Sequence, residues 1–424
     1  MAGLSDLLAG IRELEGFASF ARPPALSDLL DEAREGAVVA FAVSRYRSDA
    51  LLLHGKDVTA LPLPRLIWDD LLEQIRVFHR ALAVAGDAAA SRQQIQEAQK
   101  TLRSVLEWLW DRATGPVLEA LGHTGEPAPG TPWPRVWWAT GGVLGLLPVH
   151  AAGHHGDPPG GPSGRGRRTV MDRVVSSHTP TIRALSHARR RRETQRKKAS
   201  ATAVGAAGTE MAAAENRSLI VAMPVTPGAP PLYKVREEVE KVSGHLPRPV
   251  VLSPYAEGNE DGDRLPTRDN VLAHLPGCTV AHFSCHGEAR ADDPSSSRLF
   301  LLDHETAPFT VAGLAPVRLD SAELAYLSAC RTAFGGSLQL ADEAIHLVSA
   351  FQLAGFPHVV GTQWEISDAR AVQIADHFYT EIRNGEGVFD SDRAAFALHR
   401  AVRKLRDRMP QAPFLWAAFV HAGA

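Results

Sequence analysis

Two apolar stretches decide the predicted fold: TVAHFSCHG at residues 279–287 and ELAYLSAC at residues 323–330. Each is a short and nearly continuous apolar run, which is typical of a strand buried on both faces. Helical patterns lie before and after each run. Strands that alternate with helices in this way predict a mostly parallel sheet covered on both faces. We therefore expect a three-layer α/β/α domain in the second half of the chain.

The rest of the second half keeps this alternation. Further strands are predicted at 218–224, 249–255, 358–364 and 415–423, with a small hairpin around 298–303. Helices are predicted at 233–246, 267–275, 341–355, 367–383 and 391–408. The helix at 233–246 is amphipathic, so its Glu and Lys side chains should face water. Thr267 can cap the following helix by accepting from the amide of Asn270.

The first half has a different pattern. Residues 1–35 predict one or two short amphipathic helices with a break at Pro23 and Pro24, which we interpret as an N-terminal helical arm. A β-hairpin pattern begins at residue 36. Two long helical stretches, 66–85 and 91–121, follow, and a strand with a Gly-Gly turn lies within 134–153. In the second helical stretch, helical spacing predicts four core residues: Leu102, Val105, Leu106 and Leu109.

Loop and linker patterns set the domain limits. GHHGDPPGGPSGRGRR is too rich in Gly and Pro for a regular element, so we expect a surface loop in which His154 and His155 are only polar loop residues. The basic run at 188–198 should be a solvated helix end that leads into a low-complexity linker at 201–215. The predicted units are therefore the arm at 1–35, a first half at 36–200, the linker, and a second half at 216–424.

Candidate catalytic residues follow the two strands that decide the fold. His286 ends the first, Cys330 ends the second, and the carboxyl ends of parallel strands share one edge of a sheet. An imidazole beside a thiol favours the nucleophilic thiolate and can protonate a leaving amine. The backbone amides of Gly287 and Cys330 could donate to the oxyanion that forms when the thiolate attacks an amide carbonyl. The pattern predicts a cysteine nucleophile with a histidine base.

Other functions find weaker support. Cys278, His282, Cys285 and His286 invite a zinc interpretation, but on a strand Cys285 faces away from His282 and His286, so no metal site is expected. The basic run lacks interleaved aromatic residues, so nucleic acid is not expected as the main partner. No phosphate-binding glycine motif occurs, so we expect no nucleotide or other cofactor.

Composition fits an ordinary globular protein. The chain has 424 residues, 45% of them hydrophobic, and a formal net charge of −3. No signal peptide or apolar run long enough to span a bilayer is evident, so we expect no membrane partner. Three cysteines, an odd number, suit a reducing compartment, and we expect a cytoplasmic protein.

Several ordered motifs resemble the CHAT domain, a module of cysteine peptidases related to caspases and separases. The motifs are HFSCHGEA at 282–289, LAYLSACRTAFGG at 324–336 and the stretch 341–368, followed by Phe378 and Tyr379. The resemblance places the His-Gly motif on His286 and Gly287 and the Ser-Ala-Cys motif on Ser328, Ala329 and Cys330. It implies a caspase-like catalytic half preceded by a second, degenerate and non-catalytic caspase-like half.

The resemblance also implies a protein substrate cut after a basic residue, Arg or Lys. Such a preference needs a carboxylate in the first substrate pocket. Asp368, beyond a third strand end, ranks first, then Glu365, then Asp342; the alternative for Asp368 is a cap on a helix that begins near Ala369. If Arg is preferred, the basic run at 188–198 is also a candidate self-processing site.

An endopeptidase that is always active would cleave proteins of its own cell, so we expect its activity to be regulated. We expect conditional activity, in a defence or cell-death pathway, under a regulatory or sensor protein. The family's tetratricopeptide repeats do not occur in this chain. The competing hypothesis is a catalytically idle module that keeps the caspase-like fold for interaction or as a scaffold, but the intact motifs at His286 and Cys330 favour the enzyme.

Overall fold

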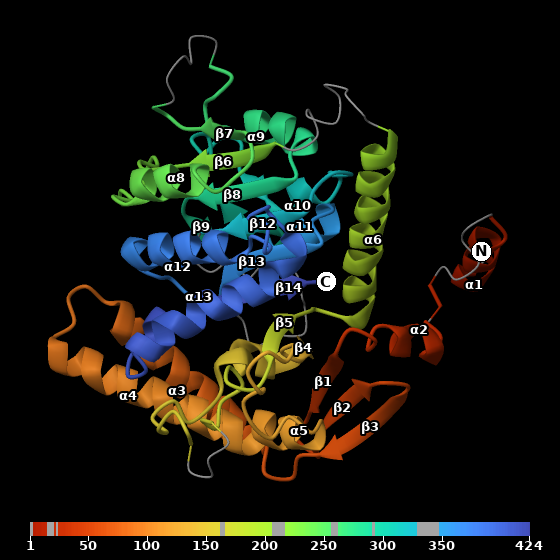
Figure 1. Ribbon diagram of the computed structural model, residues 1–424, viewed down its shortest axis with the longest axis vertical. Helices are drawn as coiled ribbons and strands as arrows, with labels where there is room; N and C mark the ends of the chain where they lie inside the picture. The colour runs from red at the N-terminus through yellow and green to blue at the C-terminus, as the bar shows by residue number, and fades with distance from the viewer. Residues whose placement is uncertain are drawn as a thin grey trace.

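One large sheet forms the centre of the molecule (Figure 1). The computed structural model describes residues 3–14, 21–22, 24–161, 166–205, 217–255, 262–290, 293–328 and 347–424. These residues form an 11-stranded sheet in the order β3-β2-β1-β4-β5-β14-β13-β12-β8-β6-β7 and a 3-stranded sheet in the order β11-β10-β9. The predicted α/β fold with a mostly parallel sheet is confirmed.

The second half supplies six neighbouring strands of the large sheet. They are β6 (Ser218–Ala222), β7 (Pro249–Leu252), β8 (Val280–Ser284), β12 (Leu324–Leu327), β13 (His358–Thr362) and β14 (Phe419–Gly423). Strands β7, β6, β8, β12 and β13 run parallel, whereas β14 is antiparallel to β13. The small sheet contains β9 (Gly287–Glu288), β10 (Arg298–Leu299) and β11 (Phe309–Thr310).

Helices cover both faces of this half-sheet. Those described are α8 (Val235–Ser243), α9 (Arg268–His274), α10 (Val311–Leu314), α11 (Leu347–Ala354), α12 (Asp368–Glu381) and α13 (Ala394–Arg408). Strand residues alternate between two cores: Val280 and Leu324 pack with α8, α12 and α13, whereas Ala281 and Ala325 pack with α9, α10 and α11. The predicted three layers are confirmed. Thr267 caps α9 as expected, with its hydroxyl 3.4 Å from the Asn270 amide nitrogen.

The first half supplies the remaining five strands. They are β1 (Ala37–Val43), β2 (Ser48–His54), β3 (Asp57–Pro62), β4 (Arg135–Ala139) and β5 (Val175–His178). Its helices are α3 (Trp68–Gly86), α4 (Arg92–Leu109), which continues through a π-helical turn (Trp110–Thr114), and α5 (Gly115–Ala120). The predicted core residues of α4, Leu102 among them, are fully buried. Strand β3 extends the predicted hairpin by one antiparallel strand.

Long-range contacts join the two halves. Strand β14 pairs with β5 at Ala422 and His178, so the large sheet is continuous. The guanidinium of Arg406 on α13 lies 2.6 and 2.7 Å from the two carboxylate oxygens of Asp172, and both side chains are buried. His155 is also buried there, 2.8 Å from the carbonyl oxygen of Ala151. The expectation that His155 is only a polar loop residue is therefore wrong, because the loop returns its imidazole to the core.

The basic run lies on a long helix, α6 (Ile182–Gly205), which stands beside both halves (Figure 1). Arg189 pairs with Glu32, and Arg192 pairs with Glu35 and Asp392. Because the side chains of Arg189 and Arg192 are only 10% and 14% exposed, the expected solvated helix end is wrong for this face. The linker expected at 201–215 overlaps the end of α6, and residues 206–216 lie outside the described residues.

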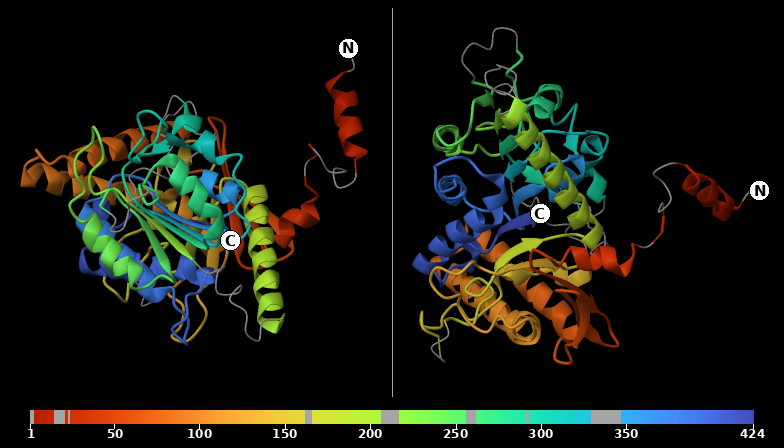
Figure 2. Two further views of the ribbon diagram at one scale, coloured as in Figure 1. Left: turned by 90° about the horizontal axis from the view of Figure 1, so that it is seen from above. Right: turned by 45° about the vertical axis from the view of Figure 1, so that its right-hand side comes forward.

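The N-terminal arm contains α1 (Leu4–Arg12) and α2 (Leu26–Asp31). Helix α1 projects away from the rest of the molecule in every view, whereas α2 lies against the first half (Figures 1 and 2). None of the helices in the described ranges combines the length and apolar content needed to cross a membrane. The limits of the predicted domains, and the interpretation of the first half as a degenerate copy, stay predictions.

Candidate active site

His286 follows β8 at the edge where the parallel strands of the second half end. The apolar side chains of β8 fix the strand between the two cores, and Cys285 is still buried. The chain then leaves the large sheet and enters the small one at Gly287, which pairs with Leu299. The amide nitrogen of Phe300 donates to the carbonyl oxygen of His286 at 2.9 Å. The backbone of His286 is therefore held between two sheets, while its side chain remains accessible.

The imidazole of His286 has a defined partner. Its Nε2 atom lies 2.7 Å from the carbonyl oxygen of Pro230. A carbonyl oxygen can only accept a hydrogen bond, so Nε2 carries a proton, and in the neutral imidazole Nδ1 keeps its lone pair. A histidine oriented by a third group in this way is prepared to act as a base through the other nitrogen.

The loop that supplies Pro230 is itself fixed. It connects β6 to α8, and its first amide, that of Met223, donates to the carbonyl oxygen of Ser284 at 2.9 Å. Nε2 of His304 lies 2.9 Å from the carbonyl oxygen of Pro227. The loop that carries the Pro230 carbonyl is thus held by hydrogen bonds to the end of β8 and to the segment that follows β10.

The strand that leads to the predicted nucleophile ends beside the end of β8. Strand β12 pairs with β8 in parallel, with Leu327 opposite Phe283, and Ser328 follows at the same edge. Cys330 comes two residues later in the chain. Cys330 and Asp342 lie outside the described residues. The pairing of His286 with Cys330, and the oxyanion donors at Gly287 and Cys330, stay predictions.

Two of the predicted substrate carboxylates, Glu365 and Asp368, follow β13, the next strand at this edge. Glu365 is exposed, and Asp368 is partly buried as the first residue of α12. The N-cap position belongs to Ser367, so Asp368 is not the cap that the alternative interpretation required. An acid in the first turn still interacts favourably with the helix dipole. Asp368 therefore lies after the third strand of this edge, and its role in substrate binding stays a prediction.

A buried polar cluster beneath this edge escaped the sequence analysis. We name it the Glu238 cluster; its members are Glu238, His282, Ser284, Ser328 and Tyr379. Glu238 was expected to face water, but its residue is only 3% exposed. The signal was present in the sequence, because Val235, Glu238 and Val242 share one face of α8 at helical spacing.

The cysteines and histidine of the rejected zinc interpretation lie apart. Cys278 and Cys285 belong to the core on the α9 side of the sheet, whereas His282 faces α12 and contacts Tyr379. Burial raises the pKa of the Cys278 thiol, which keeps it protonated. In the described part of the chain, no group of three or more potential ligands could hold a metal ion.

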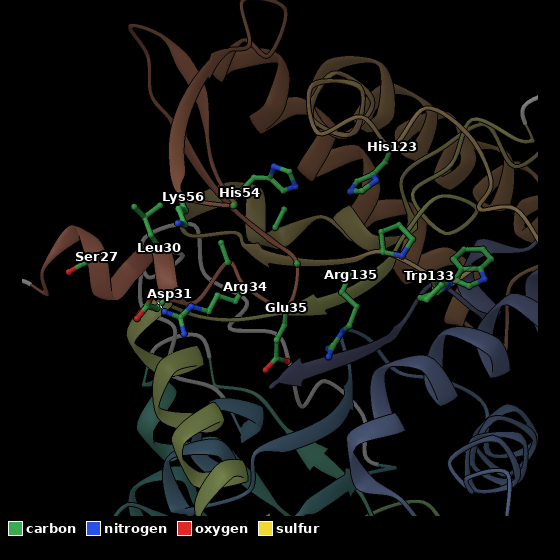
Figure 3. Close-up of a pocket in the computed structure, with 16 residues that line it drawn as sticks. Ser27, Leu30, Asp31, Arg34, Glu35, His54, Lys56, His123, Trp133 and Arg135 are labelled. Carbon is green, nitrogen blue, oxygen red and sulfur yellow. Dashed lines mark hydrogen bonds and ion pairs between the residues drawn. The ribbon is translucent and has the colours of Figure 1, made fainter. Parts of the chain in front are cut away.

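A cavity of about 800 Å³ opens in the first half (Figure 3). Its walls come from the end of α2, the turn after β2 and the start of β4, with Glu35, His54, His123 and Arg135 among the lining residues. Every lining residue falls within 27–135, so none of the predicted catalytic or substrate residues contributes to it. The candidate active site is therefore the strand edge at His286 rather than this cavity.

The fold and the edge at His286 define a caspase-like α/β protein. Two crystal structures of the Saccharomyces cerevisiae separase–securin complex share the fold, with TM-scores of 0.55 and 0.53 at 12% identity. These matches cover 94% of this chain but only 31% and 30% of the matched chains. The Arg-specific cysteine proteinase gingipain R shows a weaker likeness, with a TM-score of 0.41, 9% identity, and coverage of 80% of this chain and 68% of the other.

The chain belongs to the CHAT domain family, whose model matches residues 103–424. This range includes the whole second half and much of the first. No curated protein sequence matches the chain. The resemblance noted from the motifs at His286 and Cys330 is confirmed at the level of the family.

Proposed function

We propose that this protein is a cysteine endopeptidase with Cys330 as nucleophile and His286 as general acid and base. The observation that carries the proposal is the hydrogen bond from Nε2 of His286 to the Pro230 carbonyl at 2.7 Å. It leaves Nδ1 as the basic nitrogen at the edge where β12 ends. Family membership supports the same assignment.

The reaction proceeds through an acyl-enzyme. Nδ1 of His286 takes the proton of the Cys330 thiol, and the thiolate attacks the carbonyl carbon of the scissile amide. The amides of Gly287 and Cys330 donate to the oxyanion. His286 then returns the proton to the leaving amine, and water, deprotonated by His286, hydrolyses the thioester.

The substrate is a protein cut after Arg or Lys. Asp368 supplies the carboxylate of the first pocket, with Glu365 second and Asp342 third. Support comes from the place of Asp368, which follows β13 on the edge shared with His286 and is partly buried. A carboxylate in such a position can pair with a guanidinium bidentately.

Activity is regulated by a protein partner in the cytoplasm, in a defence or cell-death pathway. The separase structures that share this fold contain securin, which supports the idea that a peptidase of this fold is held by another protein. The first half acts as a degenerate, non-catalytic caspase-like unit. Its sheet and core are continuous with those of the second half, which supports a role as a structural base.

A peptide panel tests the proposal. Peptides that differ only at the residue before the scissile bond are incubated with the wild type, Cys330→Ala and Asp368→Ala. We expect turnover after Arg or Lys, none by Cys330→Ala, and a selective loss for basic peptides in Asp368→Ala. The matched control is Asp69→Ala, which removes an exposed acid from the first turn of α3. Equal turnover by Cys330→Ala would end the peptidase proposal and favour the idle module.

A further inference from the structure

Glu238 links β8 to the residue that follows β12, on the two segments that lead to the proposed catalytic pair. Its Oε1 atom accepts from the hydroxyl of Ser328 at 2.6 Å and lies 3.3 Å from Nε2 of His282. Ser328 follows β12, and His282 belongs to β8. One carboxylate oxygen on α8 thus contacts both strands at once.

The remaining contacts of the Glu238 cluster fix its protons. Burial raises the pKa of Tyr379 well above its ordinary value, and the nearby Tyr326 and Glu238 raise it further. A carboxylate oxygen accepts, so Nε2 of His282, 3.3 Å from Oε1 of Glu238, carries a proton, and in the neutral imidazole Nδ1 accepts from the Tyr379 hydroxyl 3.1 Å away. The hydroxyl oxygen of Ser284 lies 3.0 Å from the same Nε2 atom. Each polar group of the cluster has a partner.

The spacing along each strand connects the cluster to the site. Ser284 precedes His286 by two residues, and Ser328 precedes Cys330 by two residues. Ser284 is the last residue of β8, and Ser328 is the last described residue after β12. The cluster therefore holds the chain within two residues of each proposed catalytic residue.

Packing alone does not require this arrangement. A buried carboxylate costs several kcal/mol to desolvate, and apolar residues of similar volume often stabilise a protein more. Val235 and Val242 already pack the same face of α8 against the sheet. The geometry points to a functional reason for a carboxylate between them.

We propose that Glu238 is a positioning residue, which holds the ends of β8 and β12 so that His286 and Cys330 meet in reactive geometry. The proposal rests on the proposed function, since it assumes that these two residues react together. Misplacement of reacting groups by about 1 Å can cost about 100-fold in rate. Glu238 should therefore affect kcat, whereas KM, which depends on the substrate pocket, should change little.

The test compares four single variants and one double variant with the wild type. Glu238→Leu removes the acceptor and keeps the volume, Glu238→Gln keeps one acceptor oxygen, and Ser328→Ala removes one hydroxyl. Glu240→Gln, an exposed residue of the same helix, is the matched control. Two rates are measured: turnover of an Arg peptide, and alkylation of Cys330 by iodoacetamide between pH 5 and 9, followed by peptide mass spectrometry. Thermal unfolding is recorded for each variant.

We expect kcat to fall by about 100-fold in Glu238→Leu and by about 10-fold in Glu238→Gln and in Ser328→Ala. Alkylation of Cys330 at pH 7 should slow in the same order, with its midpoint moved to higher pH, because the thiolate loses the imidazole. Glu240→Gln should match the wild type. The double variant Glu238→Gln with Ser328→Ala should lose little more than either single variant.

Each other outcome has a defined meaning. Folded Glu238 and Ser328 variants with wild-type turnover and alkylation would overturn the positioning role. If Glu238→Leu does not fold, Ser328→Ala, which leaves the carboxylate in place, decides the question. If the wild type cleaves no peptide but Cys330 is alkylated rapidly and the variants slow it, the peptidase proposal fails and the positioning role stands.

Discussion

Two buried carboxylates, Asp172 and Glu238, lie in different settings. Asp172 contacts two guanidinium groups, those of Arg406 and Arg403, at 2.6 and 3.1 Å. The described partners of Glu238 are a serine hydroxyl and an imidazole. Asp172 joins the first half to α13, whereas Glu238 lies beneath the edge at His286.

These settings suggest different roles: Asp172 should stabilise the fold, whereas Glu238 should support activity. Burial alone would raise the pKa of Asp172, but hydrogen bonds and charge from Arg406 lower it well below its ordinary value. The folded state thus contains a fully paired ion pair across the joint between the halves. Glu238 contacts a serine hydroxyl and an imidazole on the two segments that lead to the proposed catalytic residues. The first should govern stability and the second activity.

The largest effect is expected at Arg406. Arg406→Leu leaves the carboxylate of Asp172 buried and poorly paired, which should cost about 3–5 kcal/mol of unfolding free energy. Urea unfolding measures the loss. The double variant Arg406→Leu with Asp172→Asn is the control and should recover part of the loss. If Arg406→Leu lowers the free energy of unfolding by less than about 1 kcal/mol, the Asp172 ion pair does not govern stability, and the proposed difference from Glu238 is wrong.

Acid should weaken the same joint. Burial, with the charge of Arg406, lowers the pKa of His155 to about 3, and burial with Arg403 lowers that of His399 to about 3. A histidine with a lowered folded pKa stabilises the fold above its unfolded pKa of about 6.5, and this contribution is lost as pH falls toward the folded value. At pH 5, His155 and His399 should each lower the free energy of unfolding by about 2 kcal/mol relative to pH 8.

Urea unfolding at pH 8 and pH 5 measures this acid sensitivity. His155→Gln keeps a donor for the carbonyl of Ala151 but cannot take up a proton, so its stability should fall less between the two pH values than that of the wild type. An identical fall in both proteins would contradict the buried, neutral state of His155.

The smallest effect is expected along α6, where paired charges are only partly buried. Arg192→Ala should lower the free energy of unfolding by about 1–2 kcal/mol, because the Arg192 side chain is only 14% exposed and pairs with Glu35. Arg196 also contacts Asp392 but is 68% exposed, so Arg196→Ala should lose less than about 0.5 kcal/mol. Equal unfolding midpoints for the two variants would show that burial does not determine how much these ion pairs stabilise the protein.

Local patterns made most of the second half predictable. Strands such as Val280–Ser284 and Leu324–Leu327 are short apolar runs, and the cap at Thr267 depends on neighbours in the sequence. The position of His286 at a strand end follows from the same patterns. These features need no knowledge of distant contacts.

The contacts across the molecule could not be predicted in this way. Arg406 and Asp172 are 234 residues apart, and nothing local marks them as partners. The arginines of α6 look like a solvated run until the acids of other segments lie beside them. Glu238 is the intermediate case, because its helical face was visible in the sequence but its partners on β8 and β12 were not.

The most direct test of the central claim is covalent labelling by a peptide chloromethyl ketone that ends in Arg, with the modified residue identified by mass spectrometry. The account predicts one adduct, on Cys330, and labelling slower by about 100-fold in His286→Ala, since removing an essential acid or base costs about that much. Labelling of the buried Cys278 or Cys285 instead, or an unchanged rate in His286→Ala, would contradict the pairing of His286 with Cys330.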